Sequence, residues 1–194
     1  MQTLQEQLNL IKEKVQKCTN CSLCENRNKI VFSDGCENAP IMFIGEAPGK
    51  NEDEQGLPFV GRAGKLLRKY LEEVGYLKED FYIANTLKCR PPQNRKPTKE
   101  EKLACEKFLL KQIEIVNPKI IVLVGTTALE SFIKTKITIT KARGEIFEIN
   151  KKLFVPVFHP SYLLRFHNEK ENSPRYLFRK DLEKILLLAR ENES

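Results

Sequence analysis

KIIVLVG, residues 119–125, places five aliphatic residues in succession between a lysine and a glycine. A strand that faces solvent on one side alternates apolar and polar residues, whereas a strand of a parallel sheet covered on both faces is apolar throughout. The stretch has the length of a strand and contains no polar residue in its middle. It therefore predicts a buried strand of a parallel sheet with helices on both faces.

Strands and helices alternate on both sides of this stretch. Thr98 and Glu101 form a capping box that opens a helix running through the region of Val116, and Pro156 favours an edge or irregular position for the last strand. This alternation predicts an α/β fold, a three-layer α/β/α sandwich around a mainly parallel four-stranded sheet, built as a single domain over residues 1–194. Further strands are predicted at 40–45, 81–85 and 153–158, and further helices at 3–17, 63–74, 126–133 and from 173 onward.

Composition narrows the class of protein. The 194 residues, of which 41% are hydrophobic, suit one domain with a sizeable core. The net charge of +7 suits a partner made of phosphates, although many basic proteins bind no nucleic acid. No apolar run approaches the roughly 20 residues that span a bilayer, and the N-terminus lacks a signal-peptide core, so we expect a cytoplasmic protein without a membrane partner. In that reducing compartment the six cysteines favour metal or cluster ligation over disulfides.

Polar residues follow the predicted strands where each one ends. Glu46 comes directly after the strand at 40–45, Asn85 ends the next, and His159 follows the last. In open parallel sheets ligands bind beyond the carboxyl ends of the strands. A carboxylate, an amide and an imidazole are therefore expected to converge on one rim of the sheet, although they lie far apart in the sequence.

Each of these residues also has an ordinary structural interpretation. Glu46, in GEAPG, lies on a tight turn that can aim side chain and backbone at a ligand, or it is a solvated glutamate at a strand exit. Phe59 could stack on a planar ligand or pack into the core. The Asn85 amide offers a ligand a donor and an acceptor side by side, or it simply ends a strand. His159 could donate to an oxygen that gains charge, or be satisfied by backbone contacts.

The cysteines suggest a metal or cluster site. Cys18 and Cys21 form a C-x-x-C pair, whereas Cys89 and Cys105 are distant from it and from each other. A zinc knuckle normally presents two local pairs, and this spacing does not choose between zinc and iron–sulfur. Cys24 and Cys36 complicate the assignment. Several of the six cysteines could also be ordinary buried residues.

Taken together, these segments resemble the family 4 uracil-DNA glycosylases over nearly the whole chain. The resemblance implies a monofunctional hydrolase of N-glycosyl bonds that removes uracil from DNA and leaves an abasic site, in base excision repair. GLAPA-like residues at the first motif mark a different subfamily, and the relatives that trap uracil covalently carry a basic insert that is absent before His159. The motifs that carry the resemblance are GEAPG at 45–49, PFVGRAGKLL at 58–67, NTLKCRPPQNR at 85–95 and FHPSYLLR at 158–165.

The resemblance also implies roles for individual residues. Glu46 and His159 correspond to the catalytic pair, and Glu52 falls in the pocket loop with a less certain role. The residues that correspond to uracil contacts are Gly45, Glu46, Ala47, Phe59, Asn85 and His159. The residues that correspond to side chains inserted into the DNA stack are Leu163, Leu164 and Arg165. The residues that correspond to ligands of a structural 4Fe-4S cluster, drawn from 18–21 and 89–105, are Cys18, Cys21, Cys89 and Cys105.

The expected partner is uracil-containing DNA, bound by a monomer, with a replication clamp as a further candidate. A positive loop without acidic residues is expected to contact phosphates. Three other functions remain open: excision of other deaminated or mismatched bases by the same fold, a non-enzymatic nucleic-acid-binding module, and a redox protein suggested by the cysteines alone. The positive loop comprises Lys88, Arg90, Arg95 and Lys96.

Overall fold

The computed structural model describes residues 2–134 and 136–191. Its strands are β1 (Asp34–Gly35), β2 (Ile41–Gly45), β3 (Phe81–Asn85), β4 (Ile120–Val124), β5 (Phe147–Ile149) and β6 (Lys152–Val157). They form one sheet in the order β1-β3-β2-β4-β6-β5. The four central strands are parallel, whereas β1 and β5 pair antiparallel at the two edges.

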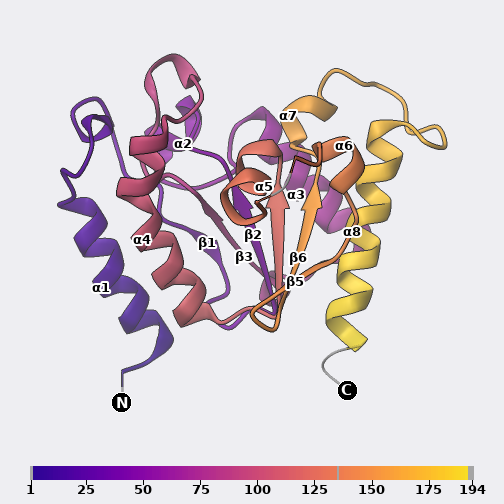
Figure 1. The fold of residues 1–194 in the computed structure, drawn as a ribbon, viewed down its shortest axis with the longest axis horizontal. Coiled ribbons are helices and arrows are strands. Elements are labelled where there is room, and N and C mark those ends of the chain that lie inside the picture. The colour runs from indigo at the N-terminus through magenta and orange to yellow at the C-terminus, as the bar shows by residue number, and fades with distance from the viewer. Residues whose placement is uncertain (1, 135, 192–194) are drawn as a thin grey trace.

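The helices cover both faces of this sheet, with α1 and α4 to one side and α8 to the other (Figure 1). The capping boxes of the first and fourth helices are formed, since Thr3 pairs with Glu6 and Thr98 with Glu101. None of the described helices is both long and apolar enough to cross a membrane. The helices are α1 (Leu4–Gln16), α2 (Lys50–Gln55), α3 (Arg62–Val74), α4 (Lys99–Val116), α5 (Thr126–Phe132), α6 (Ile139–Ala142), α7 (Pro160–Leu163) and α8 (Pro174–Glu191).

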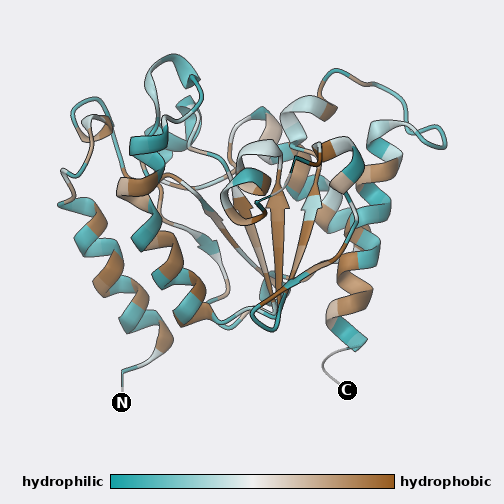
Figure 2. Cartoon of the chain, viewed as in Figure 1, coloured by the Kyte–Doolittle hydropathy of each residue, from teal (hydrophilic) through white to brown (hydrophobic). Residues whose placement is uncertain are grey.

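The central strands bury alternate residues on opposite faces, as the pleat of a strand requires. Phe43 and Val122 pack with the layer that contains α3 and α8, whereas Met42 and Leu123 pack with the layer that contains α1 and α4. Figure 2 shows these strands as the most hydrophobic part of the chain, with the hydrophilic residues on the outer sides of the helices. Burial on both faces explains why KIIVLVG has no polar residue in its middle.

The predicted α/β sandwich is confirmed, and its four parallel strands are the central four of the sheet. The sheet has six strands where four were predicted. The two additional strands, β1 and β5, are short edge strands, and neither is long enough to show a periodic pattern in the sequence. Helix α2 lies between the strand predicted at 40–45 and the helix predicted at 63–74, where no helix was predicted. Pro156 lies beyond the part of β6 that pairs with β5, so its missing N–H costs no hydrogen bond on that side.

The parallel strands place their carboxyl ends together at the upper end of the sheet in Figure 1. The chain passes from β2 to β3 on one side and from β3 to β4 on the other, so the connections diverge between β2 and β4. Such a switch point leaves a crevice outside the carboxyl ends of the two strands, where open α/β sheets bind their ligands.

Candidate active site

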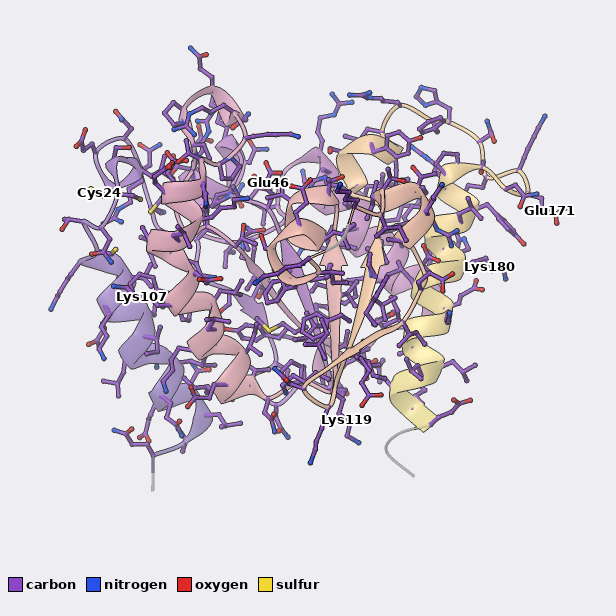
Figure 3. The ribbon with its side chains drawn as sticks, viewed as in Figure 1. Cys24, Glu46, Lys107, Lys119, Glu171 and Lys180 are labelled. Carbon is purple, nitrogen blue, oxygen red and sulfur yellow. The ribbon has the colours of Figure 1, made fainter. Side chains whose placement is uncertain are left out.

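A cavity of about 410 Å³ opens at this end of the sheet, within the usual size range of small-molecule pockets. Figure 3 shows Glu46 at that end, whereas Lys119 projects from the opposite one. Residues from four separate parts of the sequence therefore meet in one place, as their positions after the strands predicted. The lining residues are Glu46, Ala47, Gly49, Glu52, Phe59, Ala63, Gly64, Asn85, Asn94, His159 and Ser161.

Phe59 is held in the cavity wall by a strained loop. Its φ of 53° lies in the left-handed region, which is unfavourable for a bulky side chain and persists only when the surroundings fix it. The Glu52 carboxylate accepts hydrogen bonds from the backbone amides of Val60 (2.9 Å) and Gly61 (2.7 Å). Arg68 donates to the carbonyl of Phe59 at 3.0 Å. Glu52 therefore fixes the loop, which gives this residue the role that the sequence left uncertain.

Asn85 faces the cavity from the end of β3. The residue is 3% exposed and its carboxamide lines the cavity, and among residues 2–134 and 136–191 no protein group forms a hydrogen bond with that carboxamide. A Cβ on Gly45 would lie 2.4 Å from its Oδ1 and 2.6 Å from Cζ of Phe59. Only glycine at position 45 lets the amide and the aromatic ring approach so closely, so the cavity is built around an unpaired amide.

The tautomer of His159 follows from its contacts. Its Nδ1 accepts a hydrogen bond from the backbone amide of Ser161 at 3.1 Å and lies 2.7 Å from the Ser161 hydroxyl. Because a backbone amide can only donate, the proton of a neutral ring sits on Nε2. Burial lowers the pKa of His159 below its ordinary value, although Glu46 and Glu52 act in the opposite direction. The neutral ring therefore has Nε2–H as its free donor.

Glu46 is anchored at the switch point. The Thr127 hydroxyl, at the start of α5 after β4, donates to its carboxylate. Its carbonyl accepts hydrogen bonds from the Thr86 hydroxyl and the Leu87 amide. The carboxylate is thus positioned by the two strands that flank the crevice.

The cysteines gather at a second cavity, on the side of the site where Figure 3 shows Cys24. It is lined by apolar residues and by Cys18, Cys21, Cys24, Cys89 and Cys105. These cysteines are spread around the cavity, and no three Cys, His, Asp or Glu side chains of the described residues are arranged as for a single metal ion. Cys36 lies elsewhere, packed on the core near β3.

Two cations face these cysteines. Arg27 Nη1 donates to Cys89 Sγ at 3.3 Å, and Lys88 lines the cavity. Burial raises the pKa of Cys105 to about 11, while the Lys88 ammonium and amide lower it. Five sulfurs in an apolar cavity with cations beside them suit an anionic thiolate-bound cluster, so the residues fit the iron–sulfur cluster that the resemblance implies.

The predicted phosphate-contacting loop needs correction. Lys88 is 0% exposed, so it cannot reach a DNA backbone. Arg95 makes a two-pronged ion pair with Glu101. Lys96 is exposed and Arg90 is half-buried, and no carboxylate of the described chain forms an ion pair with either residue.

The predicted DNA-inserting segment also needs correction. Leu163 is 0% exposed and packs in the core with α3 and α8, so it cannot insert into a base stack without leaving the core. Leu164 is half-buried and Arg165 exposed, which leaves these two residues available. The motif gave no sign of this difference because all three residues belong to one short turn.

Several site residues were missed from the sequence. Thr127, Ser161 and Arg68 act through other residues: they hold Glu46, His159 and the Phe59 loop. Thr127 alone had a positional signal, since it follows the strand on the far side of the switch point. The other two are surface-type residues whose partners depend on tertiary packing.

Comparisons with known proteins find similar sequences within one superfamily. The uracil DNA glycosylase superfamily matches residues 32–183. A type-4 uracil-DNA glycosylase of Thermotoga maritima is 48% identical over 186 residues, which cover 95% of each chain. One of Saccharolobus solfataricus is 44% identical over 168 residues, covering 82% of this chain and 78% of its own. A type-5 uracil-DNA glycosylase of Pyrobaculum aerophilum is 30% identical over 143 residues, covering 65% of this chain and 63% of its own.

The lowered pKa of His159 predicts a pH-dependent stability. The unfolded histidine takes up a proton near its ordinary pKa of 6.5, whereas the folded one resists it. The contribution of His159 to the unfolding free energy is therefore fully present above pH 6.5, and it is lost as the pH falls through the pKa of His159 in the folded protein. We expect the unfolding free energy of the parent protein, measured by denaturant titration, to fall from pH 7.5 to pH 5 more than that of His159→Gln. Parallel pH profiles would contradict the lowered pKa.

Leu163 and Leu164 provide a matched pair. Leu163→Ala should lower the unfolding free energy by about 2–5 kcal/mol, the usual cost of emptying a buried leucine site. Leu164→Ala should lower it much less. Denaturant titration of both variants measures the difference, and equal losses would show that Leu163 is not a core residue.

Proposed function

Because the chain belongs to the type-4 enzymes of the uracil-DNA glycosylase superfamily and removes uracil from DNA in base excision repair, we propose that the cavity between Phe59, Asn85 and His159 receives the uracil. Enzymes that act on a base inside a duplex extrude it first. The unpaired Asn85 amide in a cavity with the His159 Nε2–H is the observation that carries this proposal, because together they match opposite edges of a flipped pyrimidine.

Asn85 supplies the selectivity. Its amide group donates to O4 of uracil and its carbonyl oxygen accepts from N3–H. Cytosine presents a donor and an acceptor in the reverse order, so it would leave both groups of a buried amide unpaired, which is costly. Phe59, whose backbone is fixed by Glu52, stacks on the ring. A side chain at position 45 would collide with both Asn85 and Phe59, so glycine there keeps the two contacts to the base in place.

His159 and Glu46 act on the bond that breaks. Uracil leaves as an anion and the sugar becomes cationic as the N-glycosidic bond is cleaved. The Nε2–H of the neutral His159 donates to O2, where negative charge develops. The Glu46 carboxylate, held by Thr127, stabilises the sugar cation or orients the attacking water. Both groups are fixed before the reaction, so neither needs to reorganise when the charge appears.

Cys18, Cys21, Cys89 and Cys105 are proposed as the ligands of a 4Fe-4S cluster. When bound, the cluster serves as a structural crosslink that joins the segment after α1 to the segment after β3 and to α4. Cys24 also lines the cavity, so the choice of these four among five rests on the resemblance. With the cluster at its edge, the whole chain is one glycosylase domain.

DNA is proposed to lie across the upper end of the sheet, over both cavities. Arg90 and Lys96 approach phosphates on the side of the cysteines, while Leu164 and Arg165 approach the base stack from the turn after α7. An oligonucleotide with one uracil, incubated with the protein and then treated with alkali, tests the activity directly. Panels with other deaminated bases separate uracil specificity from a broader one, and a redox protein would release no base.

His159→Ala should slow single-turnover cleavage by about 10²-fold or more, the scale of a lost oxyanion donor, because the donor acts only where charge appears in the transition state. Binding of uracil-containing DNA should change little. Single-turnover rates at saturating enzyme and a separate binding titration measure the two effects. A variant that loses DNA binding but cleaves normally would make His159 a structural residue.

Asn85→Asp should fail differently. The substitution replaces the amide donor with an acceptor, so it should impair uracil excision and improve the relative match to cytosine. Excision rates on matched oligonucleotides with uracil or cytosine at one position measure both changes. An unchanged ratio between the two bases would show that Asn85 does not read the O4 and N3 edge.

The cluster prediction is tested by colour and iron content. The purified protein should be yellow-brown with about four irons per chain, as Cys₄ ligation of a 4Fe-4S cluster implies. A variant in which any one of the four proposed ligands is replaced by serine should fail to hold the cluster. Cys24→Ser and Cys36→Ser are the controls and should keep it. A colourless protein with one zinc would contradict the cluster, and loss on Cys24→Ser would reassign a ligand.

A further inference from the structure

Lys88 is a buried charge between the two cavities. Its side chain is 0% exposed, and its Nζ donates to the backbone carbonyl of Asn85 at 2.8 Å. The ring of Phe32 lies on another side, with its centroid 5.8 Å from Nζ. No carboxylate in the described part of the chain forms an ion pair with this lysine. The basic residue predicted to face DNA is therefore enclosed by protein.

A buried ammonium without an anionic partner is costly. One carbonyl and one aromatic face do not supply a full negative charge, and Lys88 also lines the cysteine cavity. Cys89 and Cys105 line the same cavity as Lys88, so their sulfurs would supply negative charge beside the ammonium once they are deprotonated. The cysteines become anionic when they bind iron, so the cluster is the counter-charge that this position lacks.

The carbonyl that accepts the hydrogen bond from Lys88 belongs to Asn85, the residue proposed to recognise uracil. Asn85 ends β3, and its carbonyl is capped by the ammonium three residues further along the chain. The intervening backbone is fixed to the end of β2, because the amides of Thr86 and Leu87 donate to the carbonyls of Gly45 and Glu46. The Lys88 carbonyl accepts from the Val31 amide at 2.8 Å. The hydrogen bond from the Lys88 ammonium to the Asn85 carbonyl therefore spans one tight turn, whose backbone is also held by hydrogen bonds to neighbouring segments.

We propose that Lys88 is a positioning residue that couples the iron–sulfur cluster to uracil recognition, by pairing its charge with the cluster thiolates and holding the carbonyl of Asn85. This inference rests on the proposed function and extends it. The cluster then does more than shape a DNA-facing surface: it keeps in place the lysine that fixes the end of β3.

Lys88→Met tests the proposal because it removes the charge and keeps the length of the side chain. Lys107→Met is the matched control: it removes the same charge from an exposed position two residues after Cys105, where Figure 3 labels Lys107. Iron-loaded Lys88→Met should release its cluster to a chelator about 10- to 100-fold faster than the control, the usual cost of losing an outer partner of a metal site. Its KM for uracil-containing DNA should rise more than its kcat falls.

The outcomes separate the two parts of the proposal. Cluster release that matches the control contradicts the charge pairing, and an unchanged KM contradicts the tie to Asn85. If Lys88→Met does not fold, hydrogen exchange of the parent protein decides: removal of iron should expose the amides of 85–88 before those of β4, and simultaneous exposure contradicts the coupling. Iron-free parent protein contradicts the proposed cluster itself, whereas an iron-loaded series without differences contradicts only the role of Lys88.

Discussion

The in-register parallel pairing of β2 with β3 and β4 is the constraint on which the site depends. Gly45 is paired with Asn85, and Ile44 with Ala84 and Leu123, so the residues that follow these strands leave the sheet at the same level. Glu46 then lies beside Thr127, and the Asn85 amide lies against Gly45. A shift of one residue in either pairing would turn these side chains to the opposite faces of the sheet. The apolar faces resist such a shift because every residue of β2 and β4 is buried.

The wall of the cavity is stiffened by side chains that hold its backbone. A buried carboxylate, Glu52, holds two backbone amides, and Arg68 holds the carbonyl of a residue in a strained conformation. A Cβ on Gly64 would lie 2.1–2.3 Å from backbone atoms of Phe59, so the loop packs onto α3 without a gap. The adjacent Asp53 accepts hydrogen bonds from the amide and side chain of Asn28, which links α2 to the cysteine-bearing segment. Helix α2 therefore holds both the Phe59 loop of the first cavity, through Glu52, and the cysteine-bearing segment of the second, through Asp53.

Charge is divided between the two cavities. The cavity proposed to receive the base carries carboxylates and a histidine whose pKa is lowered by burial, which suits a reaction in which a cation forms on the sugar and an anion leaves. The cysteine cavity carries Arg27 and Lys88, which suit an anionic cluster. Because Lys88 touches the backbone at Asn85, the two cavities are electrostatically distinct but mechanically joined.

The sequence by itself determined the α/β/α layers of the fold and which polar residues gather at the carboxyl end of the sheet. Continuous apolar runs gave the buried strands, and the positions of Glu46, Asn85 and His159 after those strands placed them on one rim, since parallel strands share a carboxyl end. The tertiary structure alone decided what each polar group faces. Neighbouring residues of one motif, Leu163 and Leu164, differ in burial because a turn points them in different directions. Lys88 faces inward, whereas Arg95 and Lys96 of the same basic loop are exposed. The partners of Glu52, Thr127 and Ser161 come from packing between distant segments, and local pattern carries no information on such contacts.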